Sequence, residues 1–357
     1  MSILYMTYVD SEDLVSIEQI VSKIGRQIYI YDAFEKNKLK KLLVFSKHLV
    51  SSILHNEMIN IYQVGNHLTP PMKYFDFTTN IFINHGWGTK KEPGSKEISS
   101  KKGLYFWRKL RQSTDYVICH SDFDSSYFMR HELLDDLPLP KFVPLGHPRN
   151  DFLVRNKNNG ELINQVKTKL KIPSDNMVIL FAPTHRDSLI TKNNYDEKLL
   201  KYFLYELEAI DKFLSEKKIV LLFRPHYYFN FDNYAFKNIR IVSSHQFRDP
   251  RPLMISSDIL ITDYSSIYVD YLLLQKPIVF YQPDLEYYQE IRGLVIDPNN
   301  KIHMPGPKIN SLRDILDINE KDFESHDLLR ARDFFHKYSD DKSTERLIKF
   351  ISDIAKK

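Results

Sequence analysis

The sequence contains a single cysteine, little glycine and no long hydrophobic run. Cys119 alone cannot form an internal disulfide or a CxxC metal site, so we expect an intracellular protein. The 10 glycines form neither a G-x-G-x-x-G motif nor a P-loop, which argues against NAD-dependent chemistry and ATP hydrolysis. The first 15 residues lack a basic segment followed by a long apolar one, and no stretch approaches the roughly 18 apolar residues of a membrane span. We therefore expect the protein on the cytoplasmic side of the membrane.

Neither sign of charge dominates the chain. Lys and Arg outnumber Asp and Glu by only 50 to 46, and the basic residues are scattered along the sequence. A nucleic-acid-binding protein usually carries dense basic blocks or a basic stripe. We therefore expect no nucleic-acid partner.

Short apolar runs ending in Gly, Pro, Ser or Asp alternate with longer stretches of helical spacing, a pattern typical of α/β proteins with parallel sheets. With 357 residues, 43% of them apolar, the chain is long enough for two domains. Strands are expected at residues 27–32, 59–65, 80–86, 115–121 and 141–146, and then at 176–184, 218–226, 239–244, 258–263 and 277–282.

A polar segment separates the two sets of strands. Residues 154–175 carry Gly160 and Pro173, and they place the domain junction between about 150 and 175. We expect a first domain over 1–160 and a second over 161–335, both doubly wound Rossmann-type domains facing each other across a cleft.

Polar clusters follow several of the expected strands. They occupy residues 85–88, 182–187, 224–226 and 263–266. Each cluster alone is weak evidence, because a lone polar side chain beside a strand is more often structural than functional. Ligands of open parallel sheets bind beyond the carboxyl ends of the strands, so the clusters together indicate one site.

The residue types in these clusters suit a diphosphate. Ser265 and Ser266 would offer hydroxyls and backbone amides at the start of a helix, although either could simply cap that helix. Arg186 and Arg224 would add forked cationic donors for phosphate oxygens. His226 could donate to a departing phosphate, and His85, flanked by glycines, could deprotonate an attacking hydroxyl. This combination suggests a transferase that binds a diphosphate donor.

Several motifs, in order, resemble those of the CDP-glycerol glycerophosphotransferase family, which makes teichoic acids and parts of some bacterial capsules. The most specific is the long run over residues 258–294, beginning DILITDYSS. The others are HGWGTKK (85–91), GHPRND (146–151), FAPTHRD (181–187) and FRPH (223–226). The resemblance extends from about Asn80 to the tail, where residues 336–357 look like the family's closing helix.

The resemblance implies a GT-B fold, CDP-glycerol or a related CDP-polyol as donor, CMP as leaving group, and a lipid-linked or saccharide acceptor. It makes His85 the base that activates the acceptor hydroxyl. Ligands of the donor diphosphate would be Arg186, His226, Ser265 and Ser266. Thr184, within the FAPTHRD motif, is a further donor-binding candidate.

Other positions are assigned more loosely. Asp263 would orient the serine loop, although a role as an N-cap is equally compatible with the sequence. Glu286 resembles a family position near the ribose or polyol of the donor. Trp87 to Thr89 replace a Thr-Pro-Leu run of teichoic-acid members, and Tyr227 stands where a proline often follows the histidine, so the acceptor's identity stays open.

The sequence also allows predictions about a bound metal ion and about contact with a membrane. Without a DxD-like strand end we expect no tightly held metal, while Mg²⁺ can still accompany the donor. Residues 34–54 and 101–111 combine lysines or arginines with apolar and aromatic residues, as membrane-surface helices do. For the first segment, ordinary packing on the first sheet is the favoured interpretation. For the second, the two interpretations are balanced.

Two alternative functions are compatible with the same pattern. A GT-B glycosyltransferase that uses a nucleotide sugar would need a similar cleft and a similar histidine. A non-catalytic nucleotide-binding protein would share the fold, but the presence of His85, Arg186, His226 and both serines argues against a degenerate site.

Overall fold

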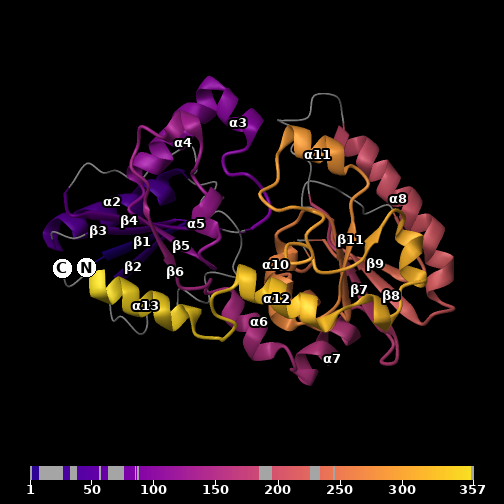
Figure 1. The fold of residues 1–357 in the computed structure, drawn as a ribbon. Coiled ribbons are helices and arrows are strands. Elements are labelled where there is room, and N and C mark those ends of the chain that lie inside the picture. Colours follow the sequence, from indigo (N-terminus) through magenta and orange to yellow (C-terminus); the bar gives the residue numbers. More distant parts are fainter. Residues whose placement is uncertain are drawn as a thin grey trace. The chain divides into compact units, whose positions relative to one another are not determined.

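The structure is a computed structural model of the whole chain. It describes residues 2–7, 27–32, 38–55, 58–62, 76–84, 86, 88–184, 195–225, 234–243 and 246–354. Two compact units, each built around its own sheet, make up the chain (Figure 1). The expected α/β class with parallel sheets is confirmed.

The first unit contains a 6-stranded sheet in the order β2-β1-β3-β4-β5-β6, with every neighbouring pair parallel. Its strands are β1 (Ser2–Thr7), β2 (Gln27–Asp32), β3 (Met58–Tyr62), β4 (Thr78–Ile83), β5 (Tyr116–Cys119) and β6 (Lys141–Pro144). The sequence analysis missed β1, which pairs on both sides. The run SILYMT is as apolar as the predicted run QIYIYD, so the sequence did carry a signal for this strand.

Helices cover both faces of the first sheet. Ile81 and Ile83 of β4 pack with Leu347 and Ile351 of α13 (Ser343–Ile354). Phe82 lies between them in sequence and packs in a separate cluster with Trp107 and Leu110 of α4 (Lys101–Ser113). Because successive side chains of a strand point to opposite faces, one strand contributes to both clusters.

The second unit contains a 6-stranded parallel sheet in the order β12-β11-β10-β7-β8-β9. Its strands are β7 (Met177–Phe181), β8 (Ile219–Phe223), β9 (Ile239–Ile241), β10 (Ile259–Thr262), β11 (Ile278–Tyr281) and β12 (Lys308–Ile309). The chain starts in the middle with β7, builds outward to β9, and returns to the other side of β7 with β10. The strand order therefore reverses between β7 and β10, which makes this pair the topological switch point of the sheet.

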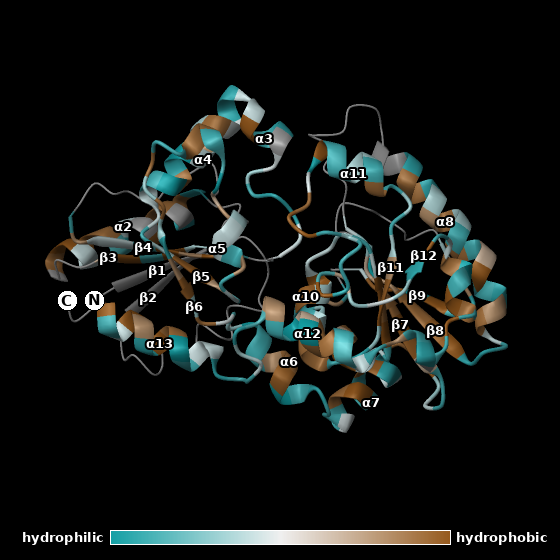
Figure 2. Ribbon diagram, viewed as in Figure 1, coloured by the Kyte–Doolittle hydropathy of each residue, from teal (hydrophilic) through white to brown (hydrophobic). Residues whose placement is uncertain are grey.

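One face of the second sheet packs against α8 (Tyr195–Leu214), whose buried residues include Phe203, Leu207 and Ile210. On the other face, Tyr268 of α10 (Ile267–Tyr271) packs edge-on against Phe280 of β11, with ring centroids 5.3 Å apart. In the second unit, β7 and β8 are drawn mainly in brown, the colour of hydrophobic residues (Figure 2). Burial on both faces explains why these strands read as continuous apolar runs.

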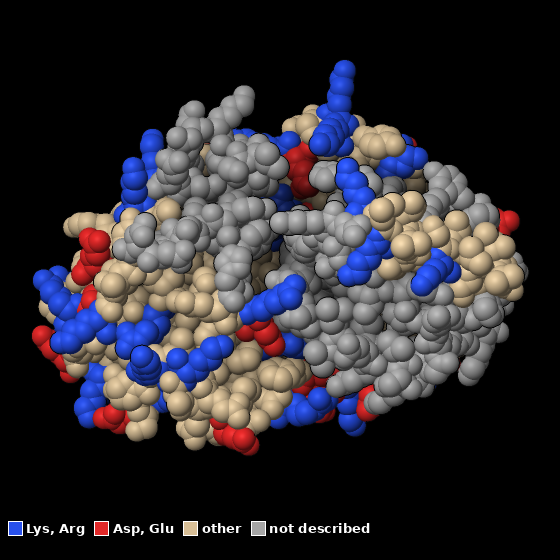
Figure 3. Space-filling model, turned by 180° about the vertical axis from the view of Figure 1, so that it is seen from behind, with Lys and Arg blue, Asp and Glu red and all other residues tan. Residues whose placement is uncertain are grey.

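The remaining helical segments connect and flank the sheets. They are α2 (Lys38–His55), α3 (Ser95–Ser99), α5 (Asp124–Tyr127), η1 (Glu132–Leu134), α6 (Asn150–Asn156), α7 (Gly160–Lys169), α9 (Arg251–Ser256), η2 (Leu272–Leu274), α11 (Leu285–Ile291), η3 (Leu312–Leu316), η4 (Glu320–Asp322) and α12 (Ser325–Phe335). On the face drawn in Figure 3, basic and acidic side chains are interspersed over the described residues.

Each of the two compact units is built from more than one segment of the chain. The first unit comprises residues 1–87, 97–151 and 336–357, and the second comprises 88–96 and 152–335. The chain passes to the second unit at residue 152, because Phe152 lies under the guanidinium of Arg251, 4.7 Å from its ring centroid, and because α7 packs on α9. The polar composition of 154–175 thus marks exposed helix surface within the second unit.

A chain of buried polar side chains joins α2 to the first sheet. His48 Nε2 lies 3.2 Å from Asn60 Oδ1, and Asn60 Nδ2 donates to Asn80 Oδ1 at 2.8 Å. Asn80 Nδ2 in turn donates to the carbonyl of Ser113 at 2.8 Å. Burial lowers the pKa of His48 to about 4, although the hydrogen bond to Asn60 partly opposes this. His48 is therefore neutral in the folded protein at neutral pH.

We expect stability to fall on acidification because the folded pKa of His48 lies below its unfolded value of 6.5. Between these two values the unfolded chain binds a proton that the folded chain does not. The free energy of unfolding should fall by up to about 1.4 kcal/mol per pH unit from this group. Burial lowers the pKa of His120 as well, so it contributes with the same sign.

Denaturant unfolding at several pH values between neutral and 4 measures this dependence. His48→Gln retains an amide near Asn60 and should flatten the profile, whereas His326→Gln, at an exposed position on α12, should leave it unchanged. An unaltered slope in His48→Gln would contradict the assignment.

Candidate functional site

Four neighbouring strands of the second sheet carry the predicted donor-binding residues at their carboxyl ends. Thr184 follows β7, Arg224 follows β8, residues 263–266 follow β10, and Glu286 lies in α11 after β11. These strands are adjacent in the order β11-β10-β7-β8 and all parallel, so their following loops leave the same edge of the sheet. The described candidates are thus gathered around the switch point between β7 and β10.

The carboxylate of Asp263 joins the two loops at that point. Its Oδ1 accepts the backbone N–H of Thr184 at 2.8 Å and that of Tyr264 at 2.6 Å. Asp263 is 1% exposed, so these charge-assisted bonds form away from solvent. The helix α10 takes Ser266, and not Asp263, as its N-cap residue. The geometry therefore places Asp263 as the residue that orients the serine loop.

Ser265 and Ser266 are half-buried at the start of α10. Ser266 occupies the N-cap position, but among the described residues its hydroxyl makes no capping hydrogen bond, and its backbone is helical with φ −64° and ψ −6°. Ser265 Oγ accepts a long bond of 3.4 Å from the N–H of Ile267. Capping therefore does not account for the Ser266 hydroxyl.

Stacked aromatic rings attach α11 to the serine loop. Tyr264 and Tyr288 are both buried, and their rings lie 4.1 Å apart with an interplanar angle of 11°. The Tyr264 hydroxyl also donates to Asp284 Oδ1 at 3.1 Å. This contact brings α11, and with it the exposed Glu286, beside the loop that carries Ser265. The sequence analysis did not single out Tyr264, Asp284 or Tyr288, although all three lie within the DYSS and PDLEYY runs.

Arg224 has a structural use in the second unit. Its Nη1 donates to the carbonyl of Phe247 at 2.7 Å, and its Nη2 lies 3.4 Å from the carbonyl of Arg248. These bonds hold the loop after β9 to the end of β8. Donor binding by Arg224 remains a prediction. It would have to use the N–H groups of the guanidinium that do not bond to these carbonyls.

Three predicted residues lie outside the described part of the chain: His85, Arg186 and His226. The described residues nearest to them in the sequence, Asn84, Gly86, Thr184 and Pro225, are buried. The roles assigned to these three residues remain predictions. Among the described residues, no group of three His, Cys, Asp or Glu side chains is arranged to hold a metal ion.

The GHPRND motif interlocks with the C-terminal helix inside the first unit. Asp151 accepts the backbone N–H groups of Ser343 and Thr344, each at 2.8 Å, and thereby caps α13. Arg346 of α13 donates through Nε to the carbonyl of Leu145 at 2.8 Å. Gly146 has φ +76°, and a Cβ there would lie 2.5 Å from Ser343 Oγ. Structural constraints thus account for much of this motif.

The HGWGTKK motif is divided between the units, with Gly88 and the residues after it belonging to the second. Lys91 N–H donates to the carbonyl of Gly293 at 3.2 Å, and Val295 N–H donates to the carbonyl of Thr89 at 3.1 Å. Gly88 has φ +90°, and a Cβ there would lie 3.0 Å from the ring of Phe335. Packing within the second unit therefore requires this glycine.

Comparison with known proteins identifies similar sequences and structures. The model of the family "CDP-Glycerol:Poly(glycerophosphate) glycerophosphotransferase" matches residues 27–353. A teichoic acid glycerol-phosphate transferase from Staphylococcus aureus is 32% identical over 240 residues, 64% of this chain and 57% of that protein. A teichoic acid poly(glycerol phosphate) polymerase from Bacillus subtilis is 35% identical over 229 residues, 63% of this chain and 29% of that protein. The chain thus spans less than two thirds of the length of either relative.

The fold is also shared with a solved structure. The wall teichoic acid polymerase TagF matches with a TM-score of 0.73 at 20% identity, over 99% of this chain and 89% of that one. This likeness confirms the expected GT-B-like fold class.

Replacing Asp263 tests the constraint at the switch point. Asp263→Ala leaves two buried N–H groups without their acceptor, so we expect a loss of about 2–4 kcal/mol in the free energy of unfolding. Asp263→Asn keeps an oxygen near both groups and should lose less. Asp258→Ala is the matched control, because Asp258 accepts the N–H of Val178 at 2.7 Å between the same strands, but at their amino ends and at an exposed position. Equal stability of Asp263→Ala and wild type in denaturant titrations would contradict this assignment.

Proposed function

The chain belongs to the CDP-glycerol:poly(glycerophosphate) glycerophosphotransferase family, and from that membership we propose that it transfers a polyol phosphate. The donor is CDP-glycerol or a related CDP-polyol, and the acceptor is a hydroxyl of a lipid-linked or saccharide chain. The products are a teichoic acid or capsule-type polymer, extended by glycerol phosphate or a related unit, and CMP.

The junction of two loops at the switch point of the second sheet carries this proposal. Asp263 holds the loop after β10 against the loop after β7, and the Ser266 hydroxyl next to it is not used for capping. A buried carboxylate that fixes hydroxyl-bearing loops at such a point is suited to orienting a charged donor. FAPTHRD, which contains Arg186, continues from the tethered Thr184 and would bring a cation to the same place.

The reaction is a displacement at phosphorus. The acceptor oxygen forms a bond to the phosphorus that bears the polyol, while the bond from that phosphorus to the bridging oxygen of CMP breaks. His85 takes the proton of the acceptor hydroxyl, and CMP leaves with the electron pair of the broken bond. Ser265, Ser266, Arg186 and His226 stabilise the charge that develops on the leaving phosphate.

The positive charge at the site comes from protein side chains in this proposal. Arg186 and a protonated His226 would neutralise the departing CMP. Mg²⁺, where it takes part, arrives with the diphosphate of the donor. The same turnover in the presence of EDTA would support this part of the proposal, and complete loss of turnover would contradict it.

Removing either histidine should abolish most of the turnover. We expect His85→Ala and His226→Ala to fold normally and to release CMP from CDP-glycerol at least about a hundredfold more slowly than wild type in the presence of acceptor. His326→Ala, an exposed position on α12, is the control for histidine loss. CDP-ribitol and nucleotide sugars, tested alongside, identify the donor. Wild-type rates in either variant would discard the role given to that residue.

The helix α2 supports a contact with the membrane surface. No described helix is long and apolar enough to cross a bilayer. In α2, however, the usual distribution of polar and apolar side chains of a surface helix is reversed. Its buried positions include the polar His48 and Ser52. Its exposed positions form an apolar stripe of Leu39, Leu42, Leu43, Val50, Ile53 and Leu54, which are between 53% and 76% exposed. With exposed Lys38, Lys40 and Lys47 nearby, this stripe fits the boundary of an anionic bilayer.

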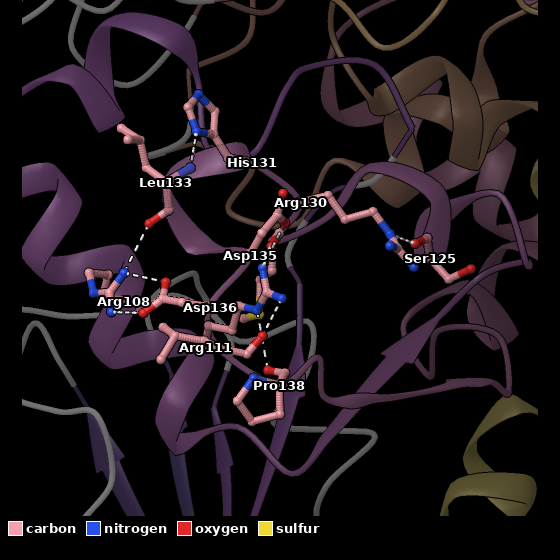
Figure 4. A network of polar contacts seen from close by, with 11 residues as sticks. Arg108, Arg111, Ser125, Arg130, His131, Leu133, Asp135, Asp136 and Pro138 are labelled. Atoms are coloured by element: carbon pink, nitrogen blue, oxygen red, sulfur yellow. Dashed lines mark hydrogen bonds and ion pairs between the residues drawn. The ribbon is translucent and has the colours of Figure 1, made fainter.

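The helix α4 is less suited to this role than its sequence indicated. Trp107 and Leu110 are buried in the core of the first unit, although Tyr105 is exposed. Arg108 pairs with Asp136, and Arg111 donates to the carbonyls of Met129 and Pro138 (Figure 4). These side chains stabilise the first unit itself. We therefore propose α2 as the contact, on the cytoplasmic face of the membrane.

Flotation with liposomes tests the membrane contact. Wild-type protein should float with vesicles that contain anionic lipid, and added salt should weaken the association. Leu42→Glu combined with Leu43→Glu should keep the protein in the soluble fraction, because two charges enter the apolar stripe. Tyr205→Glu, at a position 67% exposed on α8, is the control. Wild-type protein found only in the soluble fraction would refute this contact.

A further inference from the structure

Three histidines of the first unit are buried together. His120, His147 and His336 are 1%, 2% and 5% exposed. The ring centroid of His120 lies 5.8 Å from that of His147 and 5.0 Å from that of His336. None of these residues was assigned a role from the sequence.

The hydrogen bonds of His147 fix its protonation. Its Nδ1 accepts the backbone N–H of Arg149 at 3.3 Å, and its Nε2 lies 2.8 Å from the backbone carbonyl of Asn84. A nitrogen that accepts from an N–H carries no proton, and a nitrogen facing a carbonyl must donate. His147 is therefore the neutral tautomer with its proton on Nε2, directed at Asn84.

The residue that receives this bond lies at the end of β4. Asn84 is 2% exposed, and its carbonyl belongs to the peptide group whose nitrogen is that of residue 85. The Asn84 side chain also accepts the N–H of Gly86 at 3.5 Å, a bond that spans one residue. The backbone carbonyl of Asn84 and the backbone N–H of Gly86 are thus both engaged by described contacts.

The ring of His120 packs against that of His147, and the ring of His336 packs against that of His120. Burial, followed by the neighbouring His336 and His147, holds the pKa of His120 well below its ordinary value. The backbone of His120 is anchored on both sides, since its N–H donates to Asp124 at 2.7 Å and its carbonyl accepts from Lys337 N–H at 3.0 Å. The ring of His147 consequently packs against a fixed surface.

We propose that His147 is a positioning residue, which fixes the end of β4 for the proton transfer assigned to His85. This inference rests on the function proposed above. This role differs from simply satisfying a buried carbonyl. It predicts that replacing His147 slows the chemical step and changes hydrogen–deuterium exchange only around the end of β4. A displacement of about 1 Å in a catalytic group can cost on the order of a hundredfold in rate.

Two substitutions remove the donor and one restores it. His147→Phe keeps a ring of similar size without a donor. His147→Asn retains an oxygen for the Arg149 N–H but is too short to reach Asn84, whereas the amide nitrogen of His147→Gln reaches about as far as Nε2. The matched control is His131→Phe, because His131 Nδ1 likewise accepts a backbone N–H two residues on, from Leu133 at 3.2 Å.

Two measurements are made on each full-length variant. The first is hydrogen–deuterium exchange of peptides covering residues 80–88, which does not depend on activity. The second is CMP release from CDP-glycerol with acceptor, reported as kcat and KM per folded protein. We expect His147→Phe and His147→Asn to increase exchange in this segment and to lower kcat about ten- to a hundredfold with little change in KM for the donor. His147→Gln should recover most of both losses, and His131→Phe should match wild type.

The outcomes separate this inference from the proposed function. Unchanged exchange over 80–88 in the Phe and Asn variants overturns the positioning role, whatever reaction the protein catalyses. Increased exchange with wild-type kcat also overturns it, since the bond would then be only structural. Increased local exchange together with a wild-type protein that releases no CMP supports the orienting contact and refutes the proposed function. If His147→Phe does not fold, the comparison of Asn with Gln decides the question.

Discussion

The carboxylate of Asp263 is the contact on which the loops at the switch point of the second sheet depend. Because β7 and β10 are parallel neighbours, the loops that follow them leave the sheet side by side with backbone N–H groups that no strand can pair. Asp263 accepts one such group from each loop. Burying a carboxylate is costly unless it receives hydrogen bonds, and these two offset much of that cost. The serine loop is therefore fixed by the same residue that ends the strand.

The first unit uses the same device with different residues. Asp151 accepts two N–H groups at the start of α13, and His147 donates to the carbonyl at the end of β4. In each case a side chain from one loop satisfies the backbone of another segment distant in sequence. Loops held in this way can carry catalytic groups with little reorganisation, because their backbone geometry is set before any ligand arrives.

Periodicity predicted most strands because burial on both faces leaves a plain aliphatic signal, as in residues 219–223 and 259–262. It failed where tertiary packing overrides composition. The strand over residues 2–7 was not among the predicted strands, yet it pairs on both sides. Trp107 read as an exposed aromatic beside basic residues, but α4 turns it into the core. The chain enters the second unit at residue 152, inside the range of about 150 to 175 given for the junction, where Phe152 packs against Arg251.

By itself the sequence determined the fold class, the succession of strands and the clustering of polar residues after them. These features follow from local chemistry, since hydrophobic periodicity and a motif at the end of a strand each depend only on residues that are close in sequence. Only the tertiary structure decided that Asp263 serves two loops, that Tyr288 stacks on Tyr264, and that His147 bonds the residue before position 85. Each of these contacts joins residues from different segments, and the partner of a buried polar group is chosen by the packing that excludes water from both.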